Sequence, residues 1–105
     1  MIDEYLDDLI IELNEIFSLI KTLNLSVQTI YIGGGTPTTL SPAQLQRLLS
    51  EISALTDVSA LKEFTMEAGR PDTITAEKLA VAKQYGITRI SVDRKSTRLN
   101  YSHAT

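Results

Sequence analysis

A run of glycines is the first feature of this sequence that could bind a ligand. Gly33, Gly34 and Gly35 are followed by Thr36, and the group comes directly after the β-branched and aromatic run of residues 27–32. Glycines let a backbone approach a ligand closely, so its N–H and C=O groups could bind an amine, a carboxylate or a ribose. The run matches neither a P-loop nor the spacing Gly-x-Gly-x-x-Gly. A tight strand-to-helix turn without a ligand is the alternative.

A single carboxylate, that of Glu67, is the second such feature. Side chains alternate between the two faces of a strand, and in the strand predicted for residues 62–68 this places Glu67 opposite the apolar side chains. A buried carboxylate is costly unless it is paired or hydrogen-bonded. Glu67 is therefore a candidate to accept hydrogen bonds from ligand hydroxyls, and a structural ion pair with Arg70 or Arg89 is the alternative. The apolar side chains of the opposite face are Phe64, Met66 and Ala68.

The first element that must support these residues is a long amphipathic helix over residues 2–23. Its apolar residues recur at steps of three and four, which places them on one face. Acidic residues in its first turns suit the positive end of the helix dipole, and Asn24 is a suitable stop. The predicted apolar face consists of Ile2, Leu6, Leu9, Leu13, Ile16, Ile20 and Leu23.

Two further helices follow, each with a recognisable start. Ser41 and Gln44 form a capping-box pattern, and the helix behind it has Leu and Ile at helical spacing. Thr75 is a suitable cap for a shorter helix that runs to about Tyr85, where Gly86 provides a terminating residue.

Strands predicted for residues 27–32, 62–68 and 87–92 alternate with these helices. Strands that are separated by helices pair in parallel through crossover connections. The expected fold is therefore α/β with the order α-β-α-β-α-β, either a barrel or an open doubly wound sheet. In both, ligands bind at the carboxyl edge of the strands, where the glycine run and Glu67 fall.

Composition excludes several kinds of chemistry. The chain has no cysteine and a single histidine, His103, so it offers no thiolate and no metal-ligating set. Residues 1–92 carry seven basic and twelve acidic side chains, which argues against nucleic acid as a partner. No apolar run is long enough to cross a bilayer and no export leader is present, so we expect a cytoplasmic protein without a membrane segment.

Three strings of residues resemble a known family. TIYIGGGTPTTLSPAQL, LKEFTMEAGRPDTITAEKL and YGITRISV are similar to the oxygen-independent coproporphyrinogen III oxidase superfamily of radical S-adenosylmethionine (SAM) enzymes, and EAGRPDTIT points to its HemZ-like coproporphyrinogen dehydrogenases. The resemblance covers residues 1–92. It implies part of a TIM-like (β/α) barrel that binds SAM and a 4Fe–4S cluster. The three cysteines that hold the cluster in that family would precede Met1, so the chain is expected to be an internal fragment, inactive alone.

The resemblance also assigns roles to individual residues. Gly33, Gly34, Gly35 and Thr36 match the glycine motif that contacts the methionyl part of SAM in that family, and Glu67 matches a carboxylate that contacts the cluster-bound SAM. It implies no catalytic residue and no metal ligand in this chain.

The implied reaction is the oxidative decarboxylation of coproporphyrinogen III propionates in haem biosynthesis, with a porphyrinogen as the small-molecule substrate and an electron donor that the sequence does not identify. One alternative is a radical SAM relative with another substrate, such as a haem chaperone or a methyltransferase-like protein. The other is a non-catalytic α/β nucleotide-binding module. A Cys-x-x-x-Cys-x-x-Cys loop ahead of this stretch would separate the radical enzymes from the binding module.

The last residues differ in character from the rest. Residues 93–105 carry a net positive charge, whereas residues 1–92 are acidic, and DRKSTRLNYSH resembles the translation of a sequencing-library adapter. We therefore expect a partial radical SAM barrel domain over residues 1–92 and a non-native tail over residues 93–105. Independent genomic reads that encode the tail continuously past Val92 would contradict this expectation.

Overall fold

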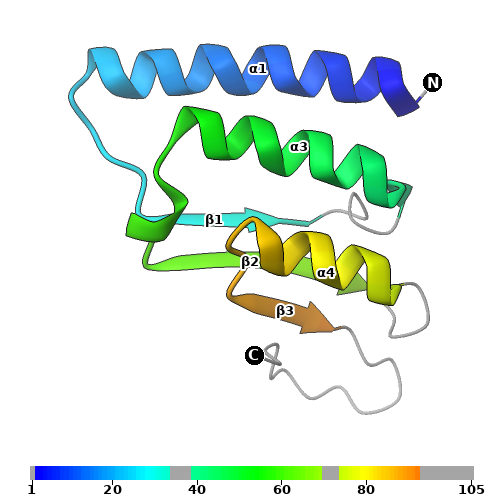
Figure 1. Cartoon of the computed structure of the whole chain (residues 1–105). Coiled ribbons are helices and arrows are strands. Elements are labelled where there is room, and N and C mark those ends of the chain that lie inside the picture. The colour runs from blue at the N-terminus through cyan, green and yellow to red at the C-terminus, as the bar shows by residue number, and fades with distance from the viewer. Residues whose placement is uncertain (1, 34–38, 70–73, 93–105) are drawn as a thin grey trace.

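A computed structural model describes residues 2–33, 39–69 and 74–92 of the chain. Helices and strands alternate through it, as the sequence predicts, with one additional short 3₁₀ helix (Figure 1). The elements are α1 (Ile2–Thr22), β1 (Thr29–Ile32), α3 (Pro42–Leu55), η1 (Val58–Ala60), β2 (Glu63–Gly69), α4 (Ala76–Gln84) and β3 (Arg89–Val92).

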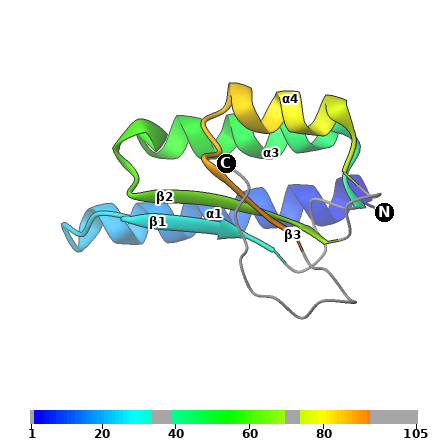
Figure 2. The same cartoon turned by 90° about the horizontal axis from the view of Figure 1, so that it is seen from below.

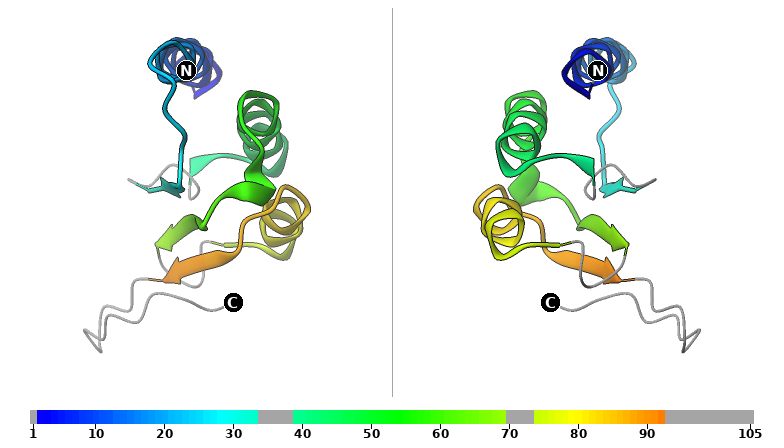
Figure 3. Two further views of the ribbon diagram at one scale, coloured as in Figure 1. Left: turned by 90° about the vertical axis from the view of Figure 1, so that its left-hand side faces the viewer. Right: turned by 90° about the vertical axis from the view of Figure 1, so that its right-hand side faces the viewer.

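The three strands form one parallel sheet with the order β1-β2-β3. All three helices lie on one face of this sheet, as the end-on views show (Figure 3). The carboxyl ends of the strands and the amino ends of α3 and α4 lie on the same side of the molecule (Figures 1 and 2). The predicted α/β class with parallel strands is confirmed, and the arrangement is consistent with part of a (β/α) barrel.

The predicted helix starts are confirmed by their hydrogen bonds. Ser41 Oγ accepts from the backbone N–H of Gln44 at 3.1 Å, and the backbone N–H of Ser41 donates to Gln44 Oε1 at 2.9 Å. This reciprocal pair is the capping box. In the same way, Thr75 Oγ1 accepts from the backbone N–H of Lys78 at 3.1 Å.

Two helices end in left-handed residues. Asn24 has φ of 58° and Gly86 has φ of 95°. After α1, the N–H of Leu25 donates to the carbonyl of Ile20 at 3.0 Å and that of Asn24 to Lys21 at 3.0 Å. The same two-bond pattern follows α4, so both ends are Schellman motifs, and Asn24 and Gly86 are the stops that the sequence indicates.

The core lies between the sheet and the helix layer, and α3 and β2 supply most of it. Phe64 and Met66 of β2 are almost completely buried, and they pack in one cluster with the apolar face of α3. Truncation of a buried residue of this size costs about 2–5 kcal/mol. The buried residues of α3 are Leu45, Leu48, Leu49 and Ile52.

Helix α1 is covered less completely than its periodicity suggests. Leu6 is its one buried residue, whereas Ile16 and Leu23 of the predicted apolar face are 52% and 57% exposed. The two residues lie on the predicted apolar face, but α1 is the outermost helix and packs against α3 (Figure 3). A repeat of three and four identifies the apolar face, but it does not show how much of that face a neighbour covers.

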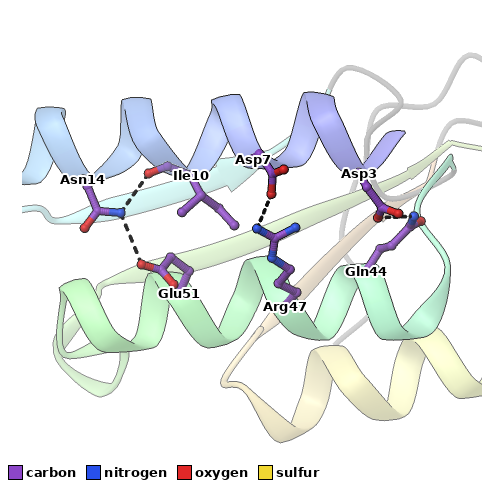
Figure 4. A network of polar contacts seen from close by, with 7 residues as sticks. All are labelled: Asp3, Asp7, Ile10, Asn14, Gln44, Arg47 and Glu51. Atoms are coloured by element: carbon purple, nitrogen blue, oxygen red, sulfur yellow. Dashed lines mark hydrogen bonds and ion pairs between the residues drawn. The ribbon is translucent and has the colours of Figure 1, made fainter. Parts of the chain in front are cut away.

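Polar contacts hold α1 against α3 beside this small apolar contact (Figure 4). They are exposed, so each contributes about 1 kcal/mol or less. They join Arg47 to Asp7, Gln44 Nε2 to Asp3 Oδ1 at 3.0 Å, and Asn14 Nδ2 to Glu51 Oε1 at 3.2 Å.

Candidate functional site

The structure brings Gly33 and Glu67 together at the carboxyl edge of the sheet. Gly33 follows the last residue of β1, and Ile32 pairs with Met66 in the register of the two parallel strands. A Cβ atom built on Gly33 would lie 2.9 Å from Glu67 Oε1. A bare stretch of backbone and a carboxylate therefore meet at one point, although 34 positions separate them in the sequence.

The predicted alternation along β2 is confirmed. Phe64, Met66 and Ala68 are buried beneath the helices, and Glu67 lies between the last two of them on the opposite face. Glu67 is half-buried. Among the residues that the structure describes, no helix covers that face (Figure 3), which is the side of the sheet that would line a barrel.

An irregularity in the sheet follows Glu67 directly. Glu67 pairs with Ser91, but the next pair joins Gly69 to Val92, so the register shifts across Ala68. Bulges of this kind bend a strand locally, and they occur often beside functional sites, where they change the direction of a side chain. The sequence pattern gave no sign of it, because a bulge depends on the register between two strands.

Tyr31 is a member of this site that the sequence analysis missed. Its ring Cε1 lies 2.6 Å from the position of a Gly33 Cβ, and the residue is 59% exposed. It pairs with Thr65, on the same face as Glu67. The signal was present in the alternation of β1, because Ile32 faces the core and its neighbour Tyr31 must then face the other way.

Arg89 has a structural partner at the opposite end of β2. Its Nη1 lies 2.8 Å from Oε2 of Glu63, and both side chains are about 40% exposed. Thr65 Oγ1 also donates to Glu63 Oε2, at 3.0 Å. The ion pair that was considered for Glu67 and Arg89 is thus formed by Glu63. Arg70, the other considered partner, lies outside the described residues.

Three of the predicted site residues, Gly34, Gly35 and Thr36, also lie outside the described part of the chain. Of the predicted site residues, the structure describes only Gly33, the first residue of the glycine run, and Glu67. These two, with Tyr31, form a notch on the open face of the sheet, defined by the missing side chain of Gly33, the ring of Tyr31 and the carboxylate of Glu67.

The chemistry of this notch suits a ligand that carries hydroxyl or ammonium groups. A carboxylate is an acceptor that binds such donors strongly. These residues therefore fit the ribose or the amino group of SAM. Within residues 2–33, 39–69 and 74–92 no group of three metal-ligating side chains occurs, and the sequence has no cysteine, so this chain supplies no thiolate for a cluster.

A separate cleft of about 280 Å³ lies next to the notch, between α1 and the edge of β1. Tyr31 and Gly33 form its border with the notch, and apolar side chains form the rest. The remaining lining residues are Tyr5, Leu9, Leu13, Ile30, Ile32, Leu48 and Ile52.

Many α/β proteins bind their ligands at the carboxyl edge of parallel strands, and this notch lies at that edge. Sequence comparison identifies relatives of this chain. The chain is 45% identical over 86 residues to the oxygen-independent coproporphyrinogen-III oxidase-like protein HemZ of Bacillus subtilis, which covers 81% of this chain and 17% of that protein. It is 45% identical over 91 residues to the heme chaperone HemW of the same organism, which covers 86% of this chain and 23% of HemW.

A more distant relative is the mitochondrial radical S-adenosyl methionine domain-containing protein 1 of Bos taurus, 30% identical over 70 residues, covering 67% of this chain and 16% of that protein. No family model and no solved structure matches the chain. The homologues of this chain are thus HemZ-like and HemW proteins of the radical SAM superfamily, matched as an internal fragment. The chain spans about a fifth of the length of the curated relatives it matches. In its described part, no helix is long and apolar enough to cross a membrane.

Proposed function

We propose that residues 1–92 form part of the SAM-binding barrel of a radical SAM protein that acts on a porphyrin. The observation that carries this proposal is the contact point of Gly33 and Glu67, where Glu67 Oε1 lies 2.9 Å from the Cβ position of Gly33. The similarity to HemZ and HemW supports it. Residues 93–105 have no part in the proposed site, and we propose that they are not native to the protein.

The residues of the notch would bind and orient the cofactor. Glu67 would accept hydrogen bonds from hydroxyl or ammonium groups of SAM, and the backbone at Gly33 would approach the cofactor without a side chain between them. The glycines and threonine that follow, Gly34 to Thr36, would extend this contact. When bound, SAM and a 4Fe–4S cluster held by cysteines outside this chain supply one-electron cleavage and hydrogen abstraction.

The proposed reaction is the oxidative decarboxylation of coproporphyrinogen III. A propionate side chain loses a hydrogen atom and CO2, and one electron passes to an acceptor, so that a vinyl group remains. The similarity to the HemZ protein and the string EAGRPDTIT support this substrate.

A second candidate is haem binding without this reaction. The chain is as similar to the heme chaperone HemW as it is to HemZ. None of the described residues that form the notch distinguishes the two, because the notch would hold the cofactor and not the porphyrin.

The test uses the protein translated from the complete reading frame that encodes this chain, hereafter the full-length protein. After anaerobic cluster reconstitution, with a one-electron reductant added for SAM cleavage and an electron acceptor for the decarboxylation, the proposal predicts that SAM yields 5′-deoxyadenosine and that coproporphyrinogen III yields a vinyl product and CO2. Cleavage of SAM with haem binding and no decarboxylation would favour the chaperone-like function. A reading frame without a three-cysteine loop ahead of this stretch would overturn both.

A further inference from the structure

Helix α1 carries a line of apolar residues that no other described element covers. They recur at steps of three, four and seven residues, which places them along one side of the helix. This side turns away from the polar contacts that α1 makes with α3 (Figure 4). All of them except Leu9 are 39–57% exposed. The residues of this outer stripe are Ile2, Tyr5, Leu9, Ile16, Leu19 and Leu23.

The spacing of the outer stripe is that of a surface against which another helix packs. A narrow apolar line with a seven-residue repeat is typical of helix pairs. The repeat continues to Leu23, whose N–H still donates to the carbonyl of Leu19 at 2.9 Å. Its one gap is Glu12, which occupies a position where the repeat would have an apolar residue. Exposed apolar surfaces of this extent mark interaction sites.

Acidic side chains border the outer stripe. Glu4, Asp8 and Glu15 flank it on the side away from α3, and Glu12 lies within it. All four are exposed, and none forms an ion pair with another described residue. A second copy of α1 would bring acidic residues against acidic residues, which disfavours pairing between copies. The charges suit a helix that has Lys or Arg beside its apolar residues.

The neighbouring helix α3 shows how a helix of this layer is completed. It has α1 on one flank and α4 on the other, whereas α1 has only α3 (Figure 3). The chain spans about a fifth of the length of the relatives it matches, so much of such a protein lies outside it. We propose that the outer stripe docks an amphipathic helix from the rest of the same polypeptide, with basic residues facing Glu12 and Glu15. This inference does not involve SAM and is independent of the proposed function.

Thiol reactivity in the full-length protein measures whether the outer stripe is covered. Leu19→Cys places a thiol in the stripe, and Ile11→Cys is the matched control on the same helix, outside the stripe. In this structure Leu19 and Ile11 are 57% and 58% exposed. Mass spectrometry follows each introduced cysteine in its own proteolytic peptide under anaerobic conditions, so that other cysteines do not interfere. We expect Leu19→Cys to react with a maleimide roughly tenfold or more slowly than Ile11→Cys, because reactivity requires an accessible thiolate. Equal rates would overturn the inference.

Carbodiimide cross-linking identifies what covers the stripe. The reagent joins a carboxylate directly to a lysine amine that it contacts. In a mixture of unlabelled and isotope-labelled full-length protein, we expect Glu12 or Glu15 to be linked to a lysine outside residues 1–105 of the same copy. Links from these two residues to a differently labelled copy would show that a second molecule covers the stripe, and would overturn the inference while leaving SAM binding unaffected.

Discussion

The two ends of β2 carry the same side chain in two different settings. Glu63, at the amino end, pairs with Arg89 at 2.8 Å and accepts a hydrogen bond from Thr65. Glu67, four residues later on the same face, lies against the bare backbone of Gly33 and beside the ring of Tyr31. Glu63 and Glu67 therefore share their side-chain type and their face of the strand, and they differ in their position along it.

The difference follows from the architecture of parallel sheets. Polar groups at the amino ends of the strands serve stability in barrels. The carboxyl ends meet the loops that bind ligands. We therefore propose that Glu63 contributes to the stability of the fold and that Glu67 contacts the ligand.

The largest expected effect comes from weakening the core packing of β2, the strand that carries both Glu63 and Glu67. Phe64 lies between them in sequence and is 1% exposed in the core. Phe64→Ala should lower the free energy of unfolding of the full-length protein by about 3–5 kcal/mol, measured by urea denaturation. Leu79→Ala on α4, at a residue that is 40% exposed, is the control and should cost far less. Similar losses in the two variants would mean that the core does not lie where the structure places it.

A pair of glycine substitutions should separate binding from stability. An alanine Cβ at Gly33 would meet Tyr31 Cε1 at 2.6 Å and Glu67 Oε1 at 2.9 Å, so both side chains would have to leave their places in the notch. Gly33→Ala should thus weaken SAM binding about tenfold or more, the equivalent of losing a charged hydrogen bond, with little change in the unfolding midpoint.

Gly86→Ala should do the reverse. Gly86 has φ of 95° and ends α4 at the amino side of β3, so alanine there costs about 1–2 kcal/mol of stability while SAM binding stays unchanged. Calorimetric binding and thermal unfolding on the same samples check both variants. If Gly86→Ala weakened SAM binding while the cofactor content stayed unchanged, this would contradict the separation of stability at the amino ends of the strands from ligand binding at their carboxyl ends.

The ion pair at the amino end should have a small and salt-dependent effect. Glu63 and Arg89 are both partly exposed, and such pairs contribute about 0–1 kcal/mol. A double-mutant cycle with Glu63→Gln and Arg89→Met should give a coupling energy in this range that decreases in high salt. A coupling well above 1 kcal/mol would show that the pair is shielded from solvent.

The smallest effect is expected in the helix layer, away from both ends of β2. Asp7 and Arg47 form an ion pair between α1 and α3, and both side chains are about half exposed. Arg47→Ala should lower the free energy of unfolding by about 1 kcal/mol or less, as urea denaturation would show, with no change in SAM binding. A loss comparable to that of Phe64→Ala would indicate that polar contacts, and not the core, hold α1 in place.

Local sequence signals predicted the framework of the fold well. The capping box at Ser41, the cap at Thr75 and the stops at Asn24 and Gly86 depend on residues close in sequence, and the structure confirms all four. The alternation along β2 was predicted for the same reason, and the parallel pairing followed from the helices that separate the strands. β1 and β3 begin later than expected, at Thr29 and Arg89.

Features that depend on contacts between distant elements were not predictable in this way. Three such features depend on which element packs against which. They are the pairing of Arg89 with Glu63, the register shift after Glu67 and the exposure of Ile16 on α1. For the candidate site, residue types indicated Gly33 and Glu67, but their approach to one point, and the presence of Tyr31 there, came from the pairing of β1 with β2.

The most direct test of the account compares Glu67→Gln with Glu63→Gln in the reconstituted full-length protein, with SAM affinity and unfolding midpoint measured for each. Glu67→Gln should weaken SAM binding by about tenfold or more, because a charged acceptor is lost. Glu63→Gln should leave SAM affinity unchanged and lower the midpoint slightly. Equal SAM affinities in the two variants and the wild type would contradict the assignment of Glu67 to the ligand.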